Sequence, residues 1–297
     1  MPVLSIDGLT KKYGKIKAVD DLSLIIEKGH VYGLLGPNGS GKTTTLGIIL
    51  DILRQDKGTY EWFDGAYGDH ARMHIGAILE TPNFYPYLNA TENLDIVRQI
   101  KGVDKVDFDE LLEVVNLANR KNSAFRTYSL GMKQRLAIAA TMIADPEVLI
   151  FDEPTNGLDP QGIAEVRNIL GRIADMGNTV IMASHILDEV EKICSHVAII
   201  KNGRMLATGP IGAILSNDTT VEIDASDRPQ LSAALKAHRH VNTVVEKKNW
   251  LECTISDDLP VEVFSKSLYD IGIAPIRFVA RKRRLEEEFL EITANQN

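Results

Sequence analysis

The feature that most constrains the fold is a glycine-rich octapeptide between an apolar segment and a segment with helical periodicity. It reads Gly36-Pro37-Asn38-Gly39-Ser40-Gly41-Lys42-Thr43 and fits the Walker A pattern G-x-x-x-x-G-K-[ST]. Glycines let backbone N–H groups approach oxyanions without a Cβ in the way, and the N-terminus of a helix adds positive potential. Val31–Leu35 leads into the loop as a predicted strand, and Thr44–Leu53 leaves it as a predicted helix. Together they predict a phosphate-binding loop (P-loop) in an α/β fold.

Two side chains of the loop have predicted roles of their own. Lys42 supplies a positive charge between phosphates, and the Thr43 hydroxyl is a ligand for Mg²⁺. The residues predicted to hold the phosphates are Gly36, Pro37, Asn38, Gly39, Ser40, Gly41, Lys42, Thr43 and Thr44. A glycine-rich turn without a ligand is the alternative, and the strand-loop-helix context argues against it.

The composition bounds the class of protein. The 297 residues, 44% of them hydrophobic, suffice for one large domain and a small one. A net charge of -8 argues against a general nucleic-acid surface, which needs clustered Lys and Arg. Cys194 and Cys253 lie far apart and match no metal-binding spacing, which favours reduced thiols in a cytoplasmic protein. Because no apolar stretch approaches the length that crosses a bilayer, we expect no membrane-spanning segment.

The order of segments predicts a layered first domain over residues 1–216. Val3–Leu9 and Ala18–Ile26 alternate in a way typical of an antiparallel sheet. Short apolar runs typical of buried parallel strands are Val31–Leu35, Ile75–Leu79, Val148–Phe151, Val180–Ala183 and Val197–Ile200. A helical subdomain over about residues 84–145 is predicted from Glu92–Ile100, Phe108–Leu117 and Leu130–Ile143. Asn202-Gly203 predicts a hairpin that closes the domain.

A second pattern begins at residue 217 and predicts a small α+β domain over residues 217–297. Its segments read strand, helix, strand, strand, helix, strand, over Thr220–Ile223, Pro229–Ala237, Val241–Glu246, Trp250–Ile255, Pro260–Asp270 and Ile276–Ala280. This order is typical of a ferredoxin-like unit. A last helix with an apolar face of Leu285, Phe289 and Ile292 is expected to follow. We interpret Trp250 as a core residue.

Two adjacent carboxylates end the apolar run Val148–Phe151. Asp152 and Glu153 stand in the Walker B arrangement. Successive side chains of a strand point to opposite faces, so Asp152 is expected to hold Mg²⁺ while Glu153 polarises the attacking water from a different direction. A solvated strand end is the alternative interpretation.

Taken together, the motifs resemble the nucleotide-binding subunits of ABC transporters. The further matches are YSLGMKQR (Tyr128–Arg135) for the LSGGQ-x-Q-R signature, EPTNGLDP (Glu153–Pro160) for the Walker B exit and D-loop, Ser184-His185 for the switch histidine, and Tyr13 for the aromatic that stacks on adenine. The resemblance covers nearly everything from about residue 3 to residue 208. It implies a RecA-like P-loop ATPase core with an antiparallel β subdomain and a helical subdomain.

The resemblance also implies an ATPase that works as a pair of subunits. ATP and Mg²⁺ are held between the phosphate loop of one subunit and the signature of the other, so Ser129 and Gly131 act on the partner's nucleotide. The pair is a homodimer or a heterodimer, and it binds an integral membrane permease at the inner face of the cell membrane. The implied catalytic residues are Lys42, Glu153 and His185, the implied metal ligands are Thr43, Glu80 and Asp152, and Tyr13 contacts the base.

Two departures from the family pattern point to one branch of it. Glu80 stands where many members have glutamine, and a carboxylate there ligates Mg²⁺ but adds negative charge beside ATP. Leu130 and Met132 replace the glycine and glutamine of the signature. Exporters of the bacitracin-resistance kind are similar to this chain in both respects, so export is the expected direction.

Several alternatives stay open at this stage. The chain can also be read as a soluble ABC-type ATPase that acts on ribosomes or DNA, as a regulatory module that holds ATP with little hydrolysis, or as the ATPase subunit of an importer. Phe84, Tyr85 and Tyr87 are interpreted either as a receptor for a permease helix or as ordinary packing of the helical subdomain. The transported substrate contacts the permease, so this sequence does not identify it.

Overall fold

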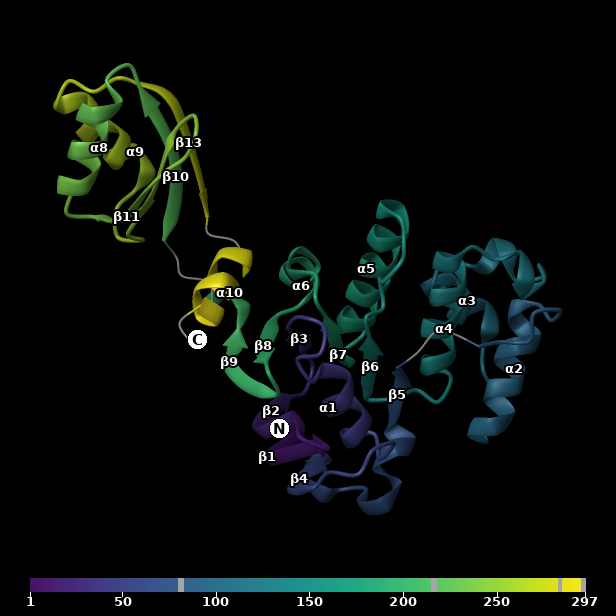
Figure 1. Ribbon diagram of the computed structural model, residues 1–297. Helices are drawn as coiled ribbons and strands as arrows, with labels where there is room; N and C mark the ends of the chain where they lie inside the picture. Colours follow the sequence, from purple (N-terminus) through teal and green to yellow (C-terminus); the bar gives the residue numbers. More distant parts are fainter. Residues whose placement is uncertain (80–82, 215–217, 283–284, 295–297) are drawn as a thin grey trace. The chain divides into compact units, whose positions relative to one another are not determined.

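The computed structural model describes residues 1–79, 83–214, 218–282 and 285–294, and the chain divides into two compact units (Figure 1). The first unit is Met1–Ile211 and the second is Gly212–Asn297. The boundary predicted between residues 216 and 217 falls outside the described residues. Each unit has its own hydrophobic cluster and is described by itself.

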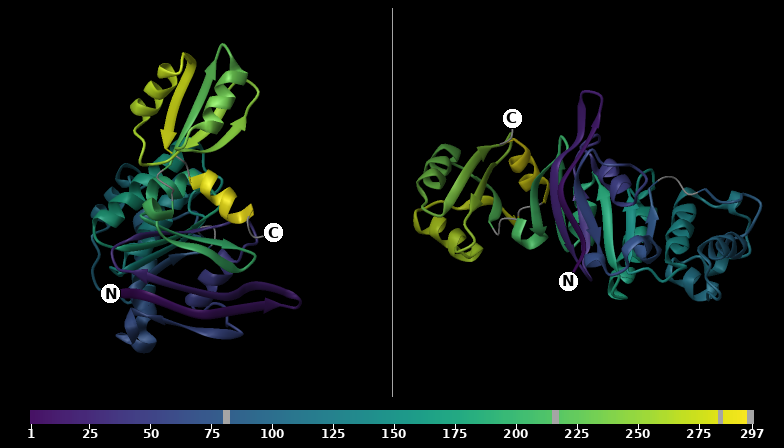
Figure 2. Two further views of the ribbon diagram at one scale, coloured as in Figure 1. Left: turned by 90° about the vertical axis from the view of Figure 1, so that its left-hand side faces the viewer. Right: turned by 90° about the horizontal axis from the view of Figure 1, so that it is seen from below.

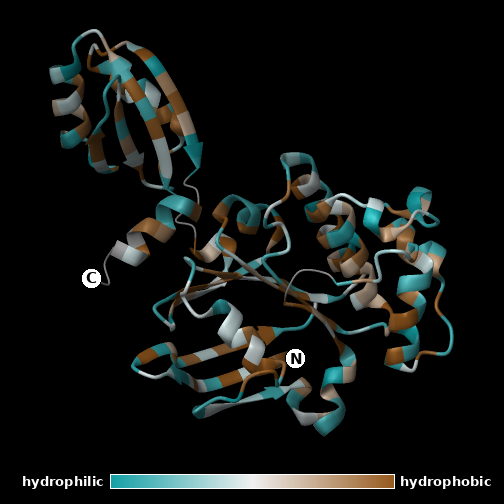
Figure 3. Cartoon of the chain, turned by 45° about the vertical axis from the view of Figure 1, so that its right-hand side comes forward, coloured by the Kyte–Doolittle hydropathy of each residue, from teal (hydrophilic) through white to brown (hydrophobic). Residues whose placement is uncertain are grey.

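A six-stranded sheet forms the centre of the first unit, in the order β5-β6-β7-β3-β8-β9. Its strands are β3 (Val31–Leu35), β5 (Ile75–Ile78), β6 (Val148–Asp152), β7 (Thr179–Ser184), β8 (His196–Lys201) and β9 (Arg204–Pro210). All pairs are parallel except β8 with β9, which form the hairpin predicted at Asn202-Gly203. Apolar side chains of β3, β6 and β7 are buried on both faces, as parallel strands require, and Figure 3 shows much brown in the centre of the first unit.

A three-stranded antiparallel sheet lies beside the central one, in the order β2-β1-β4. It consists of β1 (Pro2–Tyr13), β2 (Ile16–Glu27) and β4 (Lys57–Trp62). The sequence analysis missed β4 because its residues are mostly exposed and polar, with only Trp62 buried. Apolar residues of the two sheets and of the helix after the phosphate loop share one core cluster.

That helix, α1 (Lys42–Ile49), is shorter than the predicted segment, which extended to Leu53. Asp51 adopts a φ of 58°, so the chain leaves helical geometry there. The amides of Ile52 and Leu53 return to the carbonyl of Gly47, each at 2.9 Å, which satisfies the end of the helix. The prediction for residues 50–53 was therefore wrong.

The helical region consists of α2 (Ala90–Lys101), α3 (Phe108–Val114) and α4 (Leu130–Met142), which form a group at the right of Figure 1. Asn89 begins α2 through a capping box with Glu92. α3 ends before the predicted Leu117 because Asn116 has a φ of 54°. Short 3₁₀ turns lie at Phe63–Gly65, Gly68–His74, Ala118–Arg120 and Phe125–Thr127.

Two helices that the sequence analysis did not assign, α5 (Pro160–Asp175) and α6 (Leu187–Ile193), pack against the central sheet. The Asp159 side chain caps α5 and Pro160 occupies its first turn, so the D-loop segment also carries a helix start. A single turn, α7 (Ile211–Ile214), follows β9. Within the described ranges, no helix combines the length and the apolar character needed to cross a membrane.

The second unit has the element order that the sequence predicted. It comprises β10 (Thr219–Ala225), α8 (Arg228–Ala237), β11 (Val241–Glu246), β12 (Leu251–Ile255), α9 (Val261–Asp270), β13 (Pro275–Lys282) and α10 (Leu285–Ala294). The sheet is antiparallel with the order β11-β12-β10-β13, and α8 and α9 share a core with one of its faces (Figure 2). Assignment of this unit to the ferredoxin-like class stays a prediction. Trp250 is only partly buried, and Arg277 lies over its ring at 4.7 Å from the centroid.

Candidate functional site

The glycine-rich loop passes so close to other backbone that two of its positions accept only glycine. At Gly36, a Cβ would lie closer than 3.0 Å to the carbonyl oxygen of Ile200. At Gly41, a Cβ would lie equally close to the carbonyl oxygen of Ala18, and the φ of 108° adds strain for any other residue. Between them, residues 37–39 are exposed to solvent.

Lys42 is held inside this loop although it carries a charge. Its side chain is only 5% exposed, and Nζ donates to the carbonyl oxygens of Gly36 at 2.7 Å and Pro37 at 3.3 Å. A carboxylate oxygen of Glu153 lies 3.5 Å from the same nitrogen. The ammonium group is thus fixed at the point where the loop backbone and the Walker B segment meet.

Thr43 and Asp152 form the second contact between the loop and β6. Thr43 Oγ1 donates to Asp152 Oδ2 at 2.6 Å. The other oxygen, Asp152 Oδ1, is buried and has no hydrogen-bond partner among the described residues. Burial raises the pKa of Asp152 and the charge of Glu153 adds to the rise, whereas the hydrogen bond from Thr43 opposes it.

This pair fits Mg²⁺. A hydroxyl and a carboxylate with a spare oxygen are hard ligands, and Mg²⁺ commonly uses one or two such protein ligands together with water and phosphate oxygens. Groups of three or more His, Cys, Asp or Glu that could hold a metal by themselves are not found in the described part of the chain. Thr43 and Asp152 therefore suit a metal ion whose remaining coordination positions are filled by phosphate oxygens and water.

Glu153 does not continue strand β6, which corrects the alternation expected for the two acids. The strand ends at Asp152, and Glu153 turns away with a φ of 49° while its amide donates to the carbonyl of Ala183 at 3.0 Å. As a result one carboxylate oxygen faces Lys42, and the other lies 2.8 Å from His185 Nδ1. Lys42, Glu153 and His185 therefore form one continuous cluster.

Comparison with known proteins shows the family. The family model described as ABC transporter matches residues 19–156. The bacitracin transport ATP-binding protein BcrA of Bacillus licheniformis is 34% identical over 98% of this chain and 97% of its own length. The Nod factor export ATP-binding protein I of Ralstonia nicotianae is 33% identical over 99% of this chain and 95% of its own.

The chain belongs to the ABC transporter ATP-binding family. A solved ATP-binding subunit of an ABC transporter superposes on it with a TM-score of 0.62 at 28% identity, covering 71% of this chain and 91% of that one. The fold of the first unit is thus that of an ABC ATPase cassette, an ATP-binding and ATP-hydrolysing domain. Subunits of this family work as dimers with membrane permease partners.

The ABC signature lies at a site of its own on this chain. Ser129 caps α4 by accepting a hydrogen bond from the Met132 amide at 3.3 Å. Together with Gly131 it lines a pocket of about 410 Å³ whose other described walls come from the start of α4, the D-loop and α5. None of these lining residues belongs to the phosphate loop. The structure therefore brings Lys42, Thr43, Asp152, Glu153 and His185 together and leaves Ser129 and Gly131 apart.

The resemblance to the ABC family also predicted an adenine contact at Tyr13 and a metal ligand at Glu80, and the structure describes only the first of these residues. Tyr13 is the last residue of β1 and is 48% exposed, and Lys11 Nζ lies over its ring at 5.7 Å from the centroid. Glu80, expected as a metal ligand, lies outside the described residues.

The sequence analysis interpreted Phe84, Tyr85 and Tyr87 either as ordinary packing of the helical region or as a receptor for a permease helix. The three residues differ in this respect. Phe84 packs against Phe125 with ring centroids 5.2 Å apart, which is ordinary packing of the helical region. Tyr85 and Tyr87 are 50% and 69% exposed, so both remain available for a partner.

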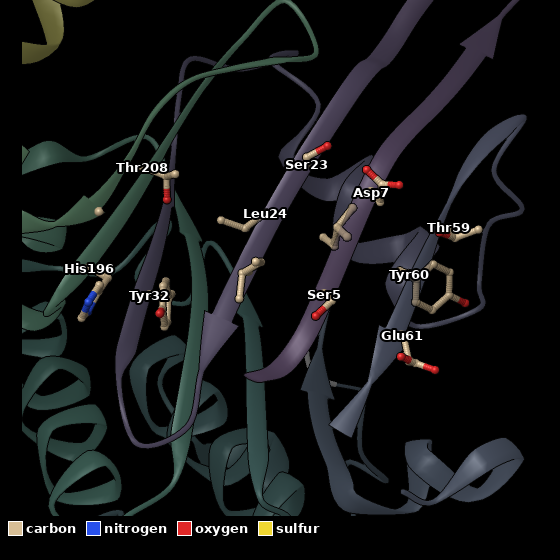
Figure 4. A pocket seen from close by; sticks show the side chains of 13 residues that line it. Ser5, Asp7, Ser23, Leu24, Tyr32, Thr59, Tyr60, Glu61, His196 and Thr208 are labelled. Atoms are coloured by element: carbon tan, nitrogen blue, oxygen red, sulfur yellow. The ribbon is translucent and has the colours of Figure 1, made fainter. Parts of the chain in front are cut away.

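Another pocket lies apart from the residues predicted to hold the nucleotide. It has a volume of about 830 Å³ and lies where β1, β2 and β4 approach the beginning of β3 and β8 (Figure 4). Figure 4 shows Tyr32 and His196 on one side and Ser5, Asp7 and Glu61 on the other. No residue predicted for ATP or Mg²⁺ lines it.

Sequence reasoning missed a buried polar pair behind the cluster of Lys42, Glu153 and His185. Thr155 Oγ1 donates to Glu189 Oε2, although the two residues are 34 positions apart. Both are almost fully buried, at 1% and 4% exposure. A signal was present in the sequence, since Glu189 follows His185 by four positions and precedes the apolar Val190. Only the fold shows that this glutamate points inward.

Proposed function

We propose that this ABC ATPase is the energy-supplying subunit of an exporter, hydrolysing ATP with Mg²⁺ at the interface of a subunit dimer. The carrying observation is the convergence of Lys42, Thr43, Asp152, Glu153 and His185 through contacts of 2.6 to 3.5 Å. The export direction is supported by the relative named for Nod factor export and by the resemblance to exporters of the bacitracin-resistance kind. The bacitracin transport relative supports the same branch.

In this proposal the phosphate loop and Lys42 bind the β- and γ-phosphates. The contacting residues are Gly36, Pro37, Asn38, Gly39, Ser40, Gly41, Lys42, Thr43 and Thr44, and Tyr13 stacks on the adenine. Thr43 and Asp152 hold Mg²⁺, with Glu80 as a further proposed ligand. When bound, Mg²⁺ neutralises charge on the phosphate oxygens. Lys42 then exchanges its carbonyl partners for phosphate oxygens without leaving the loop.

Glu153 is the proposed base or water-orienting group, and His185 is the residue that holds it. The 2.8 Å contact between them fixes the carboxylate direction and leaves the other imidazole nitrogen for the γ-phosphate. The hydrolysis step requires Glu153 to accept a proton from water. His185 Nδ1 and Lys42 Nζ each contact one oxygen of that carboxylate, at 2.8 and 3.5 Å, and so hold its position before the step.

The separate position of the signature supports the dimer. Since no described residue of the signature pocket comes from the phosphate loop, one chain supplies two half-sites that two subunits can pair head to tail. Ser129 and Gly131 then contact the γ-phosphate held by the partner. The dimer is a homodimer or a heterodimer, and we place it in the cytoplasm, bound to a membrane permease at the inner face.

The Glu153→Gln variant tests this proposal. We expect turnover to fall by about 10²- to 10⁴-fold, because the amide cannot accept the proton, while ATP affinity is preserved. Phosphate release and equilibrium ATP binding measure the two effects. Glu113→Gln is the matched control, since Glu113 is exposed on α3 away from the cluster. Turnover retained in Glu153→Gln would show that another group is the base.

A further inference from the structure

The buried pair of Thr155 and Glu189 links the two segments that carry the catalytic cluster. Thr155 lies two positions after Glu153, in the turn that leaves β6. Glu189 lies four positions after His185, on helix α6. The hydrogen bond from Thr155 Oγ1 to Glu189 Oε2 therefore ties the Glu153 segment to the His185 segment behind the contact that the two catalytic side chains make.

Stability alone does not explain a glutamate at this position. Burial raises the pKa of Glu189, and the hydrogen bond from Thr155 only opposes that rise. The other oxygen, Glu189 Oε1, is buried with no hydrogen-bond partner among the described residues. A buried polar group with an unused acceptor costs free energy that an apolar side chain of similar volume would avoid. The pair is thus retained at a cost to folding.

Helix α6 gives this link a firm support. Val190, the residue after Glu189, packs onto Gly33 of β3 so closely that a Cβ at Gly33 would lie 2.6 Å from Val190 Cγ1. β3 is the strand that enters the phosphate loop. The close packing fixes α6 relative to the loop, and Thr155 is fixed to α6.

The turn at Glu153 needs such support. Its φ of 49° is uncommon for a residue with a Cβ and is strained. Backbone bonds hold it at two points, from the Glu153 amide to Ala183 and from the Asn156 amide to the Glu153 carbonyl at 3.1 Å. Thr155 supplies a third point through its side chain.

We propose that Thr155 and Glu189 are positioning residues, which keep the Glu153 carboxylate in the place that hydrolysis requires. This inference rests on the ATPase site proposed above. In that proposed site, neither Thr155 nor Glu189 is assigned a contact with the nucleotide. Their hydrogen bond acts on the direction of Glu153 and on its contact with His185.

The test compares isosteric and conservative variants. Thr155→Val keeps the shape and removes the donor, and Glu189→Leu removes the acceptor. We expect each to lower kcat by about ten- to a hundredfold, the effect of a misplaced catalytic group, with KM for ATP changed less than about threefold. Thr155→Ser and Glu189→Gln keep a donor and an acceptor, so both should stay within about threefold of the wild-type kcat. Glu189→Gln as slow as Glu189→Leu would overturn the proposal.

The double variant Thr155→Val/Glu189→Leu separates positioning from folding. Each single variant leaves an unpaired or mismatched partner and should lower the melting temperature, whereas the double variant removes donor and acceptor together and should recover much of it. With positioning, kcat of the double variant stays low although its melting temperature recovers. Recovery of both would show a merely structural pair and refute the inference. Failure of the proposed function would give a different result, namely equal turnover in the wild type and in Glu153→Gln.

Discussion

The glycine-rich loop allows a stringent test, because a Cβ at Gly39 and a Cβ at Gly41, the N-cap of α1, would have very different surroundings. Gly39 and Gly41 both have positive φ, of 78° and 108°. A Cβ at Gly39 would meet no described atom within 4 Å, whereas at Gly41 it would lie closer than 3.0 Å to the carbonyl oxygen of Ala18. Gly39→Ala therefore measures backbone strain, and Gly41→Ala measures strain together with a steric clash.

The expected magnitudes follow from these distances. A left-handed conformation is unfavourable for alanine by about 1–2 kcal/mol, so both variants should lose about this much free energy of unfolding. Relief of the clash at residue 41 requires a displacement of about 1 Å, and such overpacking typically costs about 1–3 kcal/mol more. The excess of about 2 kcal/mol corresponds to about 4–8 °C in the melting temperature of a domain of this size. Because the loop shifts with it, ATP affinity should also fall by about tenfold, or about 1.4 kcal/mol.

The assay can report on the first unit alone. The chain has two tryptophans, and in a Trp250→Phe background the remaining Trp62 is the reporter. Trp62 is 5% exposed, and its Nε1 donates to the carbonyl of Ile49 at the end of α1, at 2.8 Å. Thermal unfolding followed by its fluorescence therefore senses the helix that leaves the loop. Equal melting temperatures and ATP affinities for Gly39→Ala and Gly41→Ala would refute the close-packing argument.

Two further outcomes are expected. Glu147 accepts hydrogen bonds from Lys28 at 2.7 Å and Tyr67 at 2.6 Å, and these hold the pKa of its carboxyl below the ordinary 4.5. The resulting stability is present above the unfolded-state pKa and is lost as pH falls through the lower folded-state value. Urea denaturation should therefore show Glu147→Gln less stable than wild type by about 1 kcal/mol at neutral pH, with the gap closing below about pH 4; a gap independent of pH would contradict the ion pair's role. In the Glu153→Gln variant, saturating Mg-ATP should give a dimer that light scattering detects. Adding Ser129→Ala should weaken this dimer, and Ser129→Gly should weaken it equally, although glycine alters the α4 cap by only a few tenths of a kcal/mol. A monomer at saturation would contradict the shared site.

The parts of the fold that the sequence predicted are those set by local patterns. Apolar runs such as Val180–Ala183 and the turn at Asn202-Gly203 specify strand and hairpin through neighbouring residues alone. Two of the missed elements, β4 and α6, lack such a pattern, whereas α5 was missed although Val166, Ile169, Leu170 and Ile173 recur at helical spacing. Strand β4 is stabilised mainly by pairing with β1, and α6 has seven residues, too few for a clear helical period.

The candidate site was predictable as a set of residues but not as a geometry. The motifs identify Asp152 and Glu153 as neighbours, and strand alternation then separates their side chains. The structure instead ends β6 between them, because the Glu153 amide still bonds to Ala183 of the adjacent strand but the φ of 49° at Glu153 then turns the chain out of the sheet. That contact depends on which strand lies next to β6, and a single sequence holds no direct record of strand order.

Strand order explains why this set of motifs converges at all. In the order β6-β7-β3, the strand that precedes His185 lies between the strand that ends at Asp152 and the strand that enters the phosphate loop. Since the three are parallel, their carboxyl ends meet at one edge of the sheet, where ligands of α/β folds commonly bind. His185 therefore emerges between Asp152 and the glycine-rich loop, within reach of Glu153 on one side. A chain with the same motifs but with β7 at the edge of the sheet would place His185 beyond both, so the contact at 2.8 Å is a product of topology as much as of the residues that make it.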